Sequence, residues 1–518
     1  MKTAGIPLGC AFCSFNRRRF LAGAGAACAA AALPLRDTAR AAETPAGKIR
    51  IRILYSLHAP KQPGPDWPNV GFDFQPVMEK FNKELGDKLP NFEFLPAMAN
   101  GPEAAKKIID QDKDIDGYLV YQMNCWNQVV QTIATSGKPV LYADFQYAGS
   151  GGFLVYTAGF LRNNAPNVGF VASSDMKDQI AAVRCFDVVR KGGSPADFVA
   201  ATAQARVKST PGSGRLACKS DSLAVLSPTE CLARMKASRI LAVRDQEAGD
   251  GGEFMGIPIT RVAFAELNDA WANADKDEAR AVADRWEKNA ALVEGVSRET
   301  LETSAAMYLG QKAVLNKYGA NAITINCLGG IYSKNMVEAY PCLGFMQLDD
   351  EGKVGACEAD QRSTLTKLIM THITGRPGFI SDPVIDTAKN RIIYAHCVGP
   401  TKVYGPAGAS NPYDIRSHSE DRKGACNRSL MPLGKMTTTM LFDHGKKQVI
   451  LHQGVTVENV DDDKACRTKL AVEVKGDVYK LMNYWDQWGW HRVTVYGDLK
   501  RRVYDIAALL GFSVIEEA

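Results

Sequence analysis

Apolar runs typical of β-strands alternate with helical patterns through the first third of the chain. The strand-like runs cover residues 49–58, 92–95, 117–122 and 139–145, and the helical patterns between them lie at 72–85, 104–110 and 126–136. Strands that alternate with helices are typical of a parallel sheet covered on both faces. We therefore expect residues 48–174 to form one doubly wound α/β domain.

The residues that follow the predicted strands of this domain are rich in amides and aromatic rings. In doubly wound sheets the ligand crevice lies beyond the carboxyl ends of the strands. There the sequence places Trp126, Gln128 and Gln146, side chains that can contact a polyhydroxylated ligand. The nearby glycine cluster at 149–152 lacks the lysine and the spacing of a phosphate-binding P-loop, so a flexible turn is the simpler interpretation.

The middle of the chain repeats this alternation, whereas the last third is β-rich. A helical pattern at 176–191 is followed by strand-like runs at 239–243, 256–264 and 321–327 and by helical patterns at 277–289 and 298–318, which predicts a second α/β domain over residues 175–350. Beyond it, short apolar runs at 391–398, 436–442, 448–452, 470–474 and 493–496 are separated by turn residues. Residues 351–518 are therefore expected to form an antiparallel β domain, such as a small barrel, with a closing helix at 500–510 that ends at Gly511.

The first 42 residues have the pattern of an export signal. Asn16-Arg17-Arg18-Arg19-Phe20-Leu21 resembles a twin-arginine signal, an Ala- and Gly-rich run follows it, and the small-x-small site Ala39-Arg40-Ala41 places cleavage near residue 42. An uncleaved membrane anchor is the alternative, but the apolar run is short for a membrane span. Residues 1–42 are thus predicted to be a signal peptide. The protein is then expected to be periplasmic or extracellular. Because the twin-arginine route exports proteins already folded, often with a cofactor in place, this signal favours a bound cofactor.

The balance of charged side chains limits the classes of partner that the protein could bind, and the cysteine spacing limits its disulfides. The 62 basic and 57 acidic side chains become equal in number once residues 1–42, with six basic and one acidic, are set aside. The mature chain therefore has no charge that favours nucleic acid or, after cleavage, a membrane surface. Its cysteines have irregular spacing without a CxxC pair. Cys218 and Cys231 could form a disulfide, whereas Cys327, Cys357 and Cys397 sit in apolar runs typical of buried thiols.

Two isolated carboxylates lie at the two ends of one amphipathic segment. Glu358 follows a run of small residues, and Asp382 ends a short apolar strand-like run just before Pro383. Burying a carboxylate at the end of a buried element costs free energy unless the carboxylate binds a metal or a proton. The alternative is that both are solvated surface acids.

The few histidines can be weighed one at a time. His396 ends the buried run IIYAHC and His491 follows an aromatic cluster, so these two are the best candidates for ligands. His418 belongs to a polar loop, residues 416–424, that could line a site or simply be solvated. His452 alternates with apolar residues, which predicts a side chain on the surface of a sheet. For each histidine, a hydrogen-bonded core position is the alternative to ligation.

Several segments resemble the L-fucose and L-arabinose isomerase superfamily. The metal-site region of that superfamily is similar to CLGFMQLDDEGKVGACEADQRSTLTKLIM, GRPGFISDP and IIYAHC, and its C-terminus is similar to WGWHRVTVYGDLKRRVYDIAALLGFSVI. Its N-terminal domain resembles DGYLVYQMNCWNQVVQTIATSGKPVLYADFQ. The resemblance extends thinly over residues 48–518. It implies a fucose isomerase-like α/β fold, with two Rossmann-like doubly wound domains followed by a C-terminal antiparallel β domain.

The resemblance also implies site residues and a reaction. Glu358 and Asp382 correspond to carboxylates that bind manganese and move the proton, and His491 corresponds to the C-terminal imidazole ligand. His396 matches an additional ligand of the arabinose branch, which the fucose branch lacks. A mixed carboxylate and imidazole set suits Mn²⁺ or another divalent metal. The implied enzyme is an aldose–ketose isomerase that acts through an ene-diolate, with Glu358 and Asp382 as the catalytic pair.

Substrate contacts and partners follow from the same resemblance. Trp126, Gln128, Gln146 and His418 are the candidate contacts to the sugar, and the family forms homo-oligomers in which a neighbouring subunit often supplies such contacts. Known isomerases of this family are cytoplasmic, whereas the signal predicts export, which favours a glycan-derived substrate. The alternatives are an exported metal-dependent enzyme that cleaves or modifies glycans on the isomerase scaffold, and a non-catalytic sugar-binding protein.

Overall fold

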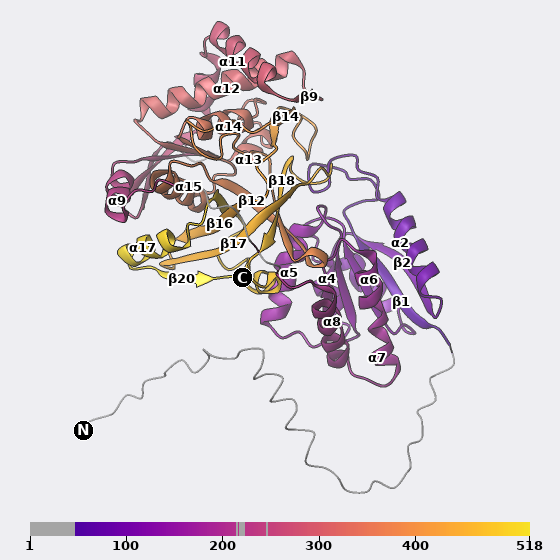
Figure 1. Ribbon diagram of the computed structural model, residues 1–518. Coiled ribbons are helices and arrows are strands. Elements are labelled where there is room, and N and C mark those ends of the chain that lie inside the picture. The colour runs from indigo at the N-terminus through magenta and orange to yellow at the C-terminus, as the bar shows by residue number, and fades with distance from the viewer. Residues whose placement is uncertain (1–46, 214–215, 217–222, 245–246) are drawn as a thin grey trace, which may run out of the picture. The chain divides into compact units, whose positions relative to one another are not determined.

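A computed structural model describes residues 47–213, 216, 223–244 and 247–518 (Figure 1). The predicted signal peptide and Cys218 lie outside these residues, so the signal and the Cys218–Cys231 disulfide stay predictions. Cys231, Cys327, Cys357 and Cys397 are free, buried thiols in the structure. No helix in the described part of the chain is long and apolar enough to cross a membrane.

A five-stranded parallel sheet organises the first part of the chain, as the alternation predicts. Its strand order is β2-β1-β3-β4-β5. The strands are β1 (Ile49–Ser56), β2 (Phe92–Ala99), β3 (Gly117–Gln122), β4 (Val140–Asp144) and β5 (Val168–Val171), and the helices are α2 (Gln75–Lys88), α3 (Pro102–Gln111), α4 (Val129–Ala134), α5 (Ser150–Arg162), α6 (Met176–Arg184), α7 (Phe186–Arg190) and α8 (Pro195–Ser209).

Alternate residues of the central strand β3 enter two different cores, as the two-residue period of a strand requires. Tyr118 and Val120 pack with α4 and α5, whereas Leu119 and Tyr121 pack with α2, α6 and α7. The first of these cores continues into the C-terminal barrel through residues such as Tyr394.

The glycine cluster at 149–152 opens helix α5, so the interpretation as a flexible turn is wrong. A Cβ atom on Gly149 would lie 2.1 Å from the carbonyl oxygen of Gln122. The glycine therefore allows the start of α5 to pack directly against the end of β3.

A second sheet has the order β11-β10-β6-β8-β7, in which only β7 is antiparallel to its neighbour. Its strands are β6 (Ile240–Arg244), β7 (Gly249–Phe254), β8 (Ile257–Ala263), β10 (Ala322–Ile325) and β11 (Val354–Ala356). The helices of this region are α9 (Pro228–Lys236), α10 (Phe264–Ala272), α11 (Lys276–Asn289), α12 (Arg298–Lys317), α13 (Cys327–Tyr332), α14 (Cys342–Asp350) and α15 (Gln361–Thr374). A mixed α/β fold with parallel sheets is thus confirmed, whereas the predicted domain boundaries stay predictions.

The C-terminal strands form a seven-stranded sheet of order β16-β19-β12-β13-β18-β17-β20. Because β16 also pairs with β17, the antiparallel strands close into a barrel, and β20 adds a parallel strand beside β17. The strands are β12 (Phe379–Asp386), β13 (Arg391–His396), β16 (Met436–Asp443), β17 (Gln448–Asn459), β18 (Thr468–Val474), β19 (Arg492–Tyr496) and β20 (Ser513–Glu516). The helices here are η1 (Thr387–Lys389), α16 (Val478–Tyr484) and α17 (Lys500–Leu510), and Gly511 ends α17 in the left-handed conformation.

The end of strand β12 differs from the sequence-based expectation. Asp382 does not end its strand, because β12 continues through Pro383 to Asp386. Strand β19 pairs only with Phe379–Ser381, so Pro383, which lacks an N–H group, costs no hydrogen bond on that side.

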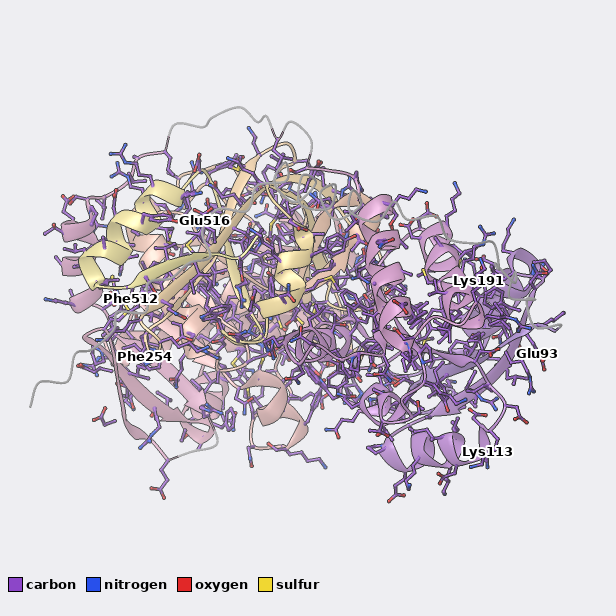
Figure 2. All side chains as sticks on the ribbon, turned by 90° about the horizontal axis from the view of Figure 1, so that it is seen from below. Glu93, Lys113, Lys191, Phe254, Phe512 and Glu516 are labelled. Carbon is purple, nitrogen blue, oxygen red and sulfur yellow. The ribbon has the colours of Figure 1, made fainter. Side chains whose placement is uncertain are left out.

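A small sheet and the chain's last strand complete the fold. The small sheet has the order β15-β14-β9 and consists of β9 (Leu292–Glu294), β14 (Tyr413–Arg416) and β15 (Cys426–Ser429). Phe512 lies just before β20 and Glu516 is its last residue. Figure 2 shows both on the opposite side of the view from Glu93 and Lys113.

Candidate metal centre

Three neighbouring barrel strands bring one carboxylate and two imidazoles together. Strand β12 lies between β19 and β13. Asp382 pairs with Ala395, so His396 follows directly on β13, and Ser381 pairs with Arg492, so His491 lies just before β19. All three side chains therefore lie at the same end of the barrel.

Glu358 reaches this end of the barrel from the second sheet. It lies beyond the carboxyl end of β11, shortly before α15. Its Oε2 atom is 3.5 Å from Nε2 of His491, and its Oε1 atom is 3.8 Å from Nε2 of His396. Ligand atoms of Glu358, His396 and His491 all lie within 4.8 Å of one another, so these residues could hold a metal ion.

The backbone at Glu358 is in an unusual conformation. Glu358 and Ala359 have φ values of 61° and 50°, in the left-handed region that non-glycine residues rarely adopt. Such strain persists only where the surroundings enforce it, and it is concentrated at functional sites. Here the conformation leaves the Glu358 side chain 41% exposed in the pocket, beside two imidazoles that are almost fully buried.

His396 has the properties of a neutral ligand. Its side chain is 1% exposed, and neither ring nitrogen has a hydrogen-bond partner among the described residues. Burial lowers the pKa of His396 to about 3, although Asp382 raises it. A buried, uncharged imidazole without a partner fits ligation to a divalent cation, which would satisfy the nitrogen that faces Glu358.

His491 is oriented by a carboxylate behind it. Its Nδ1 atom lies 2.9 Å from Oδ2 of Asp360, which leaves Nε2 facing Glu358 and Asp382. This pairing of an imidazole with a carboxylate is typical of metal ligands. Asp360 is itself fixed, because it caps helix α15 by accepting hydrogen bonds from the backbone N–H groups of Arg362 and Ser363.

The carboxylates and His491 strongly influence one another. Burial alone would lower the pKa of His491, but Asp382, Asp360 and Glu358 together raise it well above its ordinary value. Burial raises the pKa of Glu358, and Asp382 and Asp360 raise it further against the lowering effect of His491. Asp382 places its Oδ1 atom 3.2 Å from Nε2 of His491. The site thus concentrates negative charge around one point, as a cation site requires.

A cavity of about 400 Å³ lies over these groups. This volume is in the range of small-molecule sites, about 300–1,000 Å³. The described residues that line it come from the first sheet, the second sheet and the barrel: Asp66, Trp67, Cys125, Trp126, Gly151, Asn326, Leu328, Glu358, Asp382, Glu420 and Trp490. Several of them follow the carboxyl ends of β3, β10 and β11, where doubly wound sheets bind ligands.

Aromatic rings form part of the pocket wall. Trp126 is 55% exposed and packs edge to face against Trp490, with ring centroids 5.8 Å apart. A Cβ atom on Gly151 would lie 3.1 Å from both the sulfur of Cys125 and the ring of Trp490. Gly151 therefore keeps space at the start of α5 for the ring that lines the pocket.

The other predicted substrate contacts lie elsewhere. Gln128, Gln146 and His418 are not among the described residues that line the cavity. The amide of Gln146 donates to the backbone oxygen of Ile385 at 3.1 Å, and His418 is buried with Nε2 3.0 Å from the sulfur of Cys397. Their roles in substrate binding stay predictions.

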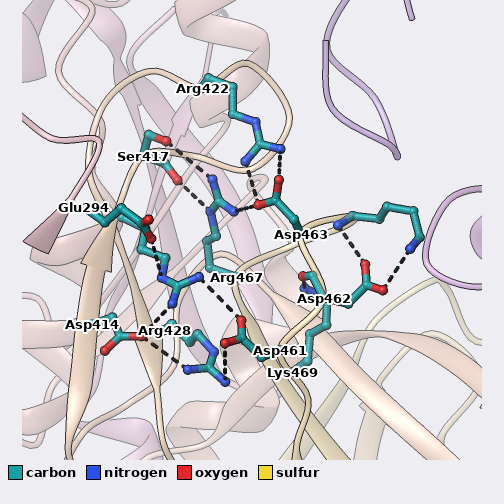
Figure 3. A network of polar contacts seen from close by, with 12 residues as sticks. Glu294, Asp414, Ser417, Arg422, Arg428, Asp461, Asp462, Asp463, Arg467 and Lys469 are labelled. Carbon is teal, nitrogen blue, oxygen red and sulfur yellow. Dashed lines mark hydrogen bonds and ion pairs between the residues drawn. The ribbon is translucent and has the colours of Figure 1, made fainter. Parts of the chain in front are cut away.

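The loop that carries His418 nevertheless reaches the cavity through Glu420. A network of charged side chains holds this loop in place (Figure 3). Arg467 donates to the backbone oxygen of Ser417 at 2.8 Å and pairs with Asp463, which also pairs with Arg422 at the other end of the loop. The network thus fixes both flanks of Glu420.

Sequence reasoning missed part of this site. Asp360 could have been found from its position as a helix N-cap two residues after Glu358. Asp66 and Trp67 belong to a loop without any periodic pattern, and Glu420 was visible only as one charge in a polar loop.

The fold and the site define a mixed α/β protein with a Glu/His/His group, two buried imidazoles and a more exposed carboxylate, that could bind a metal ion. No family model matches the chain. It is similar to a sulfoquinovose isomerase of Clostridium sp. (strain MSTE9), with 22% identity over 263 residues, which cover 49% of this chain and 57% of that protein. Sulfoquinovose isomerases of Priestia aryabhattai and Priestia megaterium are each 23% identical over 197 residues, 37% of this chain and 42% of theirs. The chain thus matches about half the length of these relatives.

Proposed function

We propose that the chain is a divalent-metal-dependent aldose–ketose isomerase and a divergent member of the L-fucose and L-arabinose isomerase superfamily. The observation that carries this proposal is the convergence of Glu358, His396 and His491, with Asp382 beside them. Glu358 and Asp382 also line a cavity whose wall includes tryptophans. The similarity to three sulfoquinovose isomerases supports a sugar isomerase. Neither the glycan-cleaving nor the sugar-binding alternative gains support from them.

The proposed arrangement of the chain follows that superfamily. The first sheet and the second sheet would each belong to a Rossmann-like domain, and the barrel to the C-terminal domain. We also propose export by the twin-arginine route, a homo-oligomeric state and manganese as the resident ion. The donor set of one or two carboxylates and two imidazoles suits manganese, because such mixed sets with open positions differ from closed structural zinc sites.

The proposed mechanism assigns proton transfer to the two carboxylates. One of Glu358 and Asp382 takes the proton from C2 of the open-chain aldose and returns it to C1, while the proton of the C2 hydroxyl passes to the oxygen on C1. The C2 hydroxyl thereby becomes the ketone, and atoms and charge balance. A bound divalent cation would supply the positive charge that stabilises the ene-diolate formed between these two transfers.

The other residues of the site position these groups. His396 and His491, with Glu358, would hold the ion, and Asp360 holds His491 in the orientation that this requires. Trp126 and Trp490 line the cavity and offer aromatic rings to the sugar.

Deuterium exchange tests the proposal. The mature protein would be incubated with Mn²⁺ and a panel of aldoses in D₂O, and label at C1 or C2 would be measured by NMR. We expect label with at least one aldose and a loss of at least about 1,000-fold in Glu358→Gln, which keeps the size of the side chain but removes the base. The matched control is Glu253→Gln, which neutralises an exposed acid on β7. Absence of exchange with every aldose would refute the proposed activity.

A further inference from the structure

The charge of the cavity wall points to one class of sugar. Four carboxylates line the cavity, Asp66, Glu358, Asp382 and Glu420, and no lysine or arginine is among its described lining residues. A bound divalent cation would offset two of these negative charges. Three of the four, Asp66, Asp382 and Glu420, lie outside the Glu/His/His group. Asp382 contacts His491, so Asp66 and Glu420 are the acidic groups that the cavity wall adds to the metal centre.

These carboxylates already repel one another. The pKa of Glu420 is raised to about 7, mainly by burial and also by Glu358, Asp66 and Asp382, against the lowering effect of His418. A carboxyl group with a pKa near neutrality can accept or donate a hydrogen bond, and both suit a sugar hydroxyl. A permanent anion in the same place would add to the repulsion.

Cations on the elements that build the site are engaged elsewhere. Lys367 on α15 donates to Asp349 at 2.7 Å, and Arg492 on β19 donates to Glu517 at 3.0 Å. Arg362 at the start of α15 pairs with Asp443 at 3.2 Å. Neither Lys367 nor Arg492 can neutralise an anionic group without breaking a pair that is almost fully buried.

The loops that carry Asp66 and Glu420 are joined to each other. The backbone N–H of Val70 donates to the backbone oxygen of Glu420 at 2.7 Å. Asp66 is oriented by two contacts: its Oδ1 atom accepts a hydrogen bond from the N–H of Trp67 at 2.7 Å, and its Oδ2 atom lies 3.0 Å from His58. The acidic wall is thus a fixed feature of the pocket, because its carboxylates belong to interlocked loops.

We infer that the substrate is a sugar without an anionic substituent, whose hydroxyl groups hydrogen-bond to Asp66 and Glu420. This inference rests on the proposed isomerase function and narrows its substrate. It distinguishes the chain from relatives that are named for sulfoquinovose, a sulfonated aldose. Rejection of an anion by two fixed carboxylates is worth at least about tenfold in relative rate.

The test compares matched sugars in the deuterium-exchange assay with the Mn²⁺-loaded protein. Each aldohexose of the panel is paired with its 6-sulfonate, its 6-phosphate and its 6-amino derivative. We expect exchange of the best uncharged or amino-substituted sugar to exceed that of every anionic sugar by at least about tenfold. An anionic sugar that exchanges as fast or faster overturns the inference and leaves the isomerase function standing. No exchange with any sugar overturns both.

A variant series links the selectivity to the named carboxylates. Glu420→Gln and Asp66→Asn should each raise the exchange rate of the anionic sugars relative to the uncharged ones by at least about threefold, whereas Glu253→Gln should leave this ratio unchanged. The far-UV circular dichroism of each variant, compared with that of the original protein, shows that the variant is folded. Binding measured by quenching of tryptophan fluorescence, with Trp126 and Trp490 in the wall, gives a second readout of the same ratio. An unaltered ratio in both variants overturns the inference.

Discussion

Removal of the charge on Asp360 tests how the site orients its ligands. Asp360 makes two kinds of contact, one to Nδ1 of His491 at 2.9 Å and one as the N-cap of α15. Asp360→Asn keeps an oxygen for the cap, and Asn and Asp are similar N-cap residues, so the cap is preserved. It removes the negative charge that holds the His491 ring and that contributes to its raised pKa.

The expected loss can be estimated from comparable metal sites. Replacing the partner behind a ligating histidine costs about 10-fold to 100-fold in metal affinity. This corresponds to about 1.4–2.7 kcal/mol of binding free energy. The free energy of unfolding without metal should also fall, because the Asp360 carboxylate no longer pairs with His491, although the cap persists.

The assay is titration of Mn²⁺ by calorimetry, with urea denaturation of the metal-free protein beside it. The matched control is Asp175→Asn, which alters another N-cap, that of α6, far along the chain from the site. This control should bind Mn²⁺ as tightly as the original protein. Wild-type affinity in Asp360→Asn would show that His491 does not depend on Asp360, and the proposed role of Asp360 would be wrong.

Three further predictions concern the pocket and the barrel. Trp126→Ala should raise the KM for the sugar about tenfold and leave the melting temperature nearly unchanged, because the ring is 55% exposed in the cavity wall. Gly151→Ala should lower the free energy of unfolding by about 1–3 kcal/mol and raise the KM, because the new Cβ atom would lie 3.1 Å from the Trp490 ring. The control is Gly159→Ala on the same helix, whose Cβ atom would have no neighbour within 4 Å and should therefore stabilise the protein. Arg492 lowers the pKa of Glu517 to about 2, against the effect of burial. The ionised Glu517 therefore stabilises the fold above pH 4.5, and this contribution is lost as the pH falls toward 2. Between pH 5 and pH 3 the original protein should therefore lose about 2 kcal/mol more unfolding free energy than Glu517→Gln, and equal losses in urea denaturation would contradict the assignment.

Local patterns predicted much of the secondary structure. The strand at 117–122 and the helix at 500–510 have the bounds that the sequence indicates, and Gly511 ends the helix as expected. These elements have strong periodicity and clear stop signals, which depend on neighbours along the chain alone. The glycine cluster at 149–152 was misinterpreted because close packing against Gln122, rather than the flexibility of glycine, explains it.

Contacts between residues far apart in the chain could not be predicted from the sequence alone. His452 alternates with apolar residues and was expected on a sheet surface, but it is buried beside Tyr394 and Glu517. Its position is determined by closure of the barrel, which joins strands far apart in the chain. Glu358, Asp382, His396 and His491 were singled out from their residue types and from the resemblance, and the structure brings them together. Their roles stay predictions, and the acidic wall at Asp66 and Glu420 could not be foreseen because two separate loops create it.

The most direct test of the central claim is anomalous diffraction from crystals of the protein soaked in Mn²⁺, recorded at the manganese absorption edge. The account predicts one strong peak within coordination distance of Glu358, His396 and His491, and its loss in crystals of His396→Ala. A peak elsewhere, or no peak at these residues at saturating Mn²⁺, would contradict the assignment of this site as the metal centre.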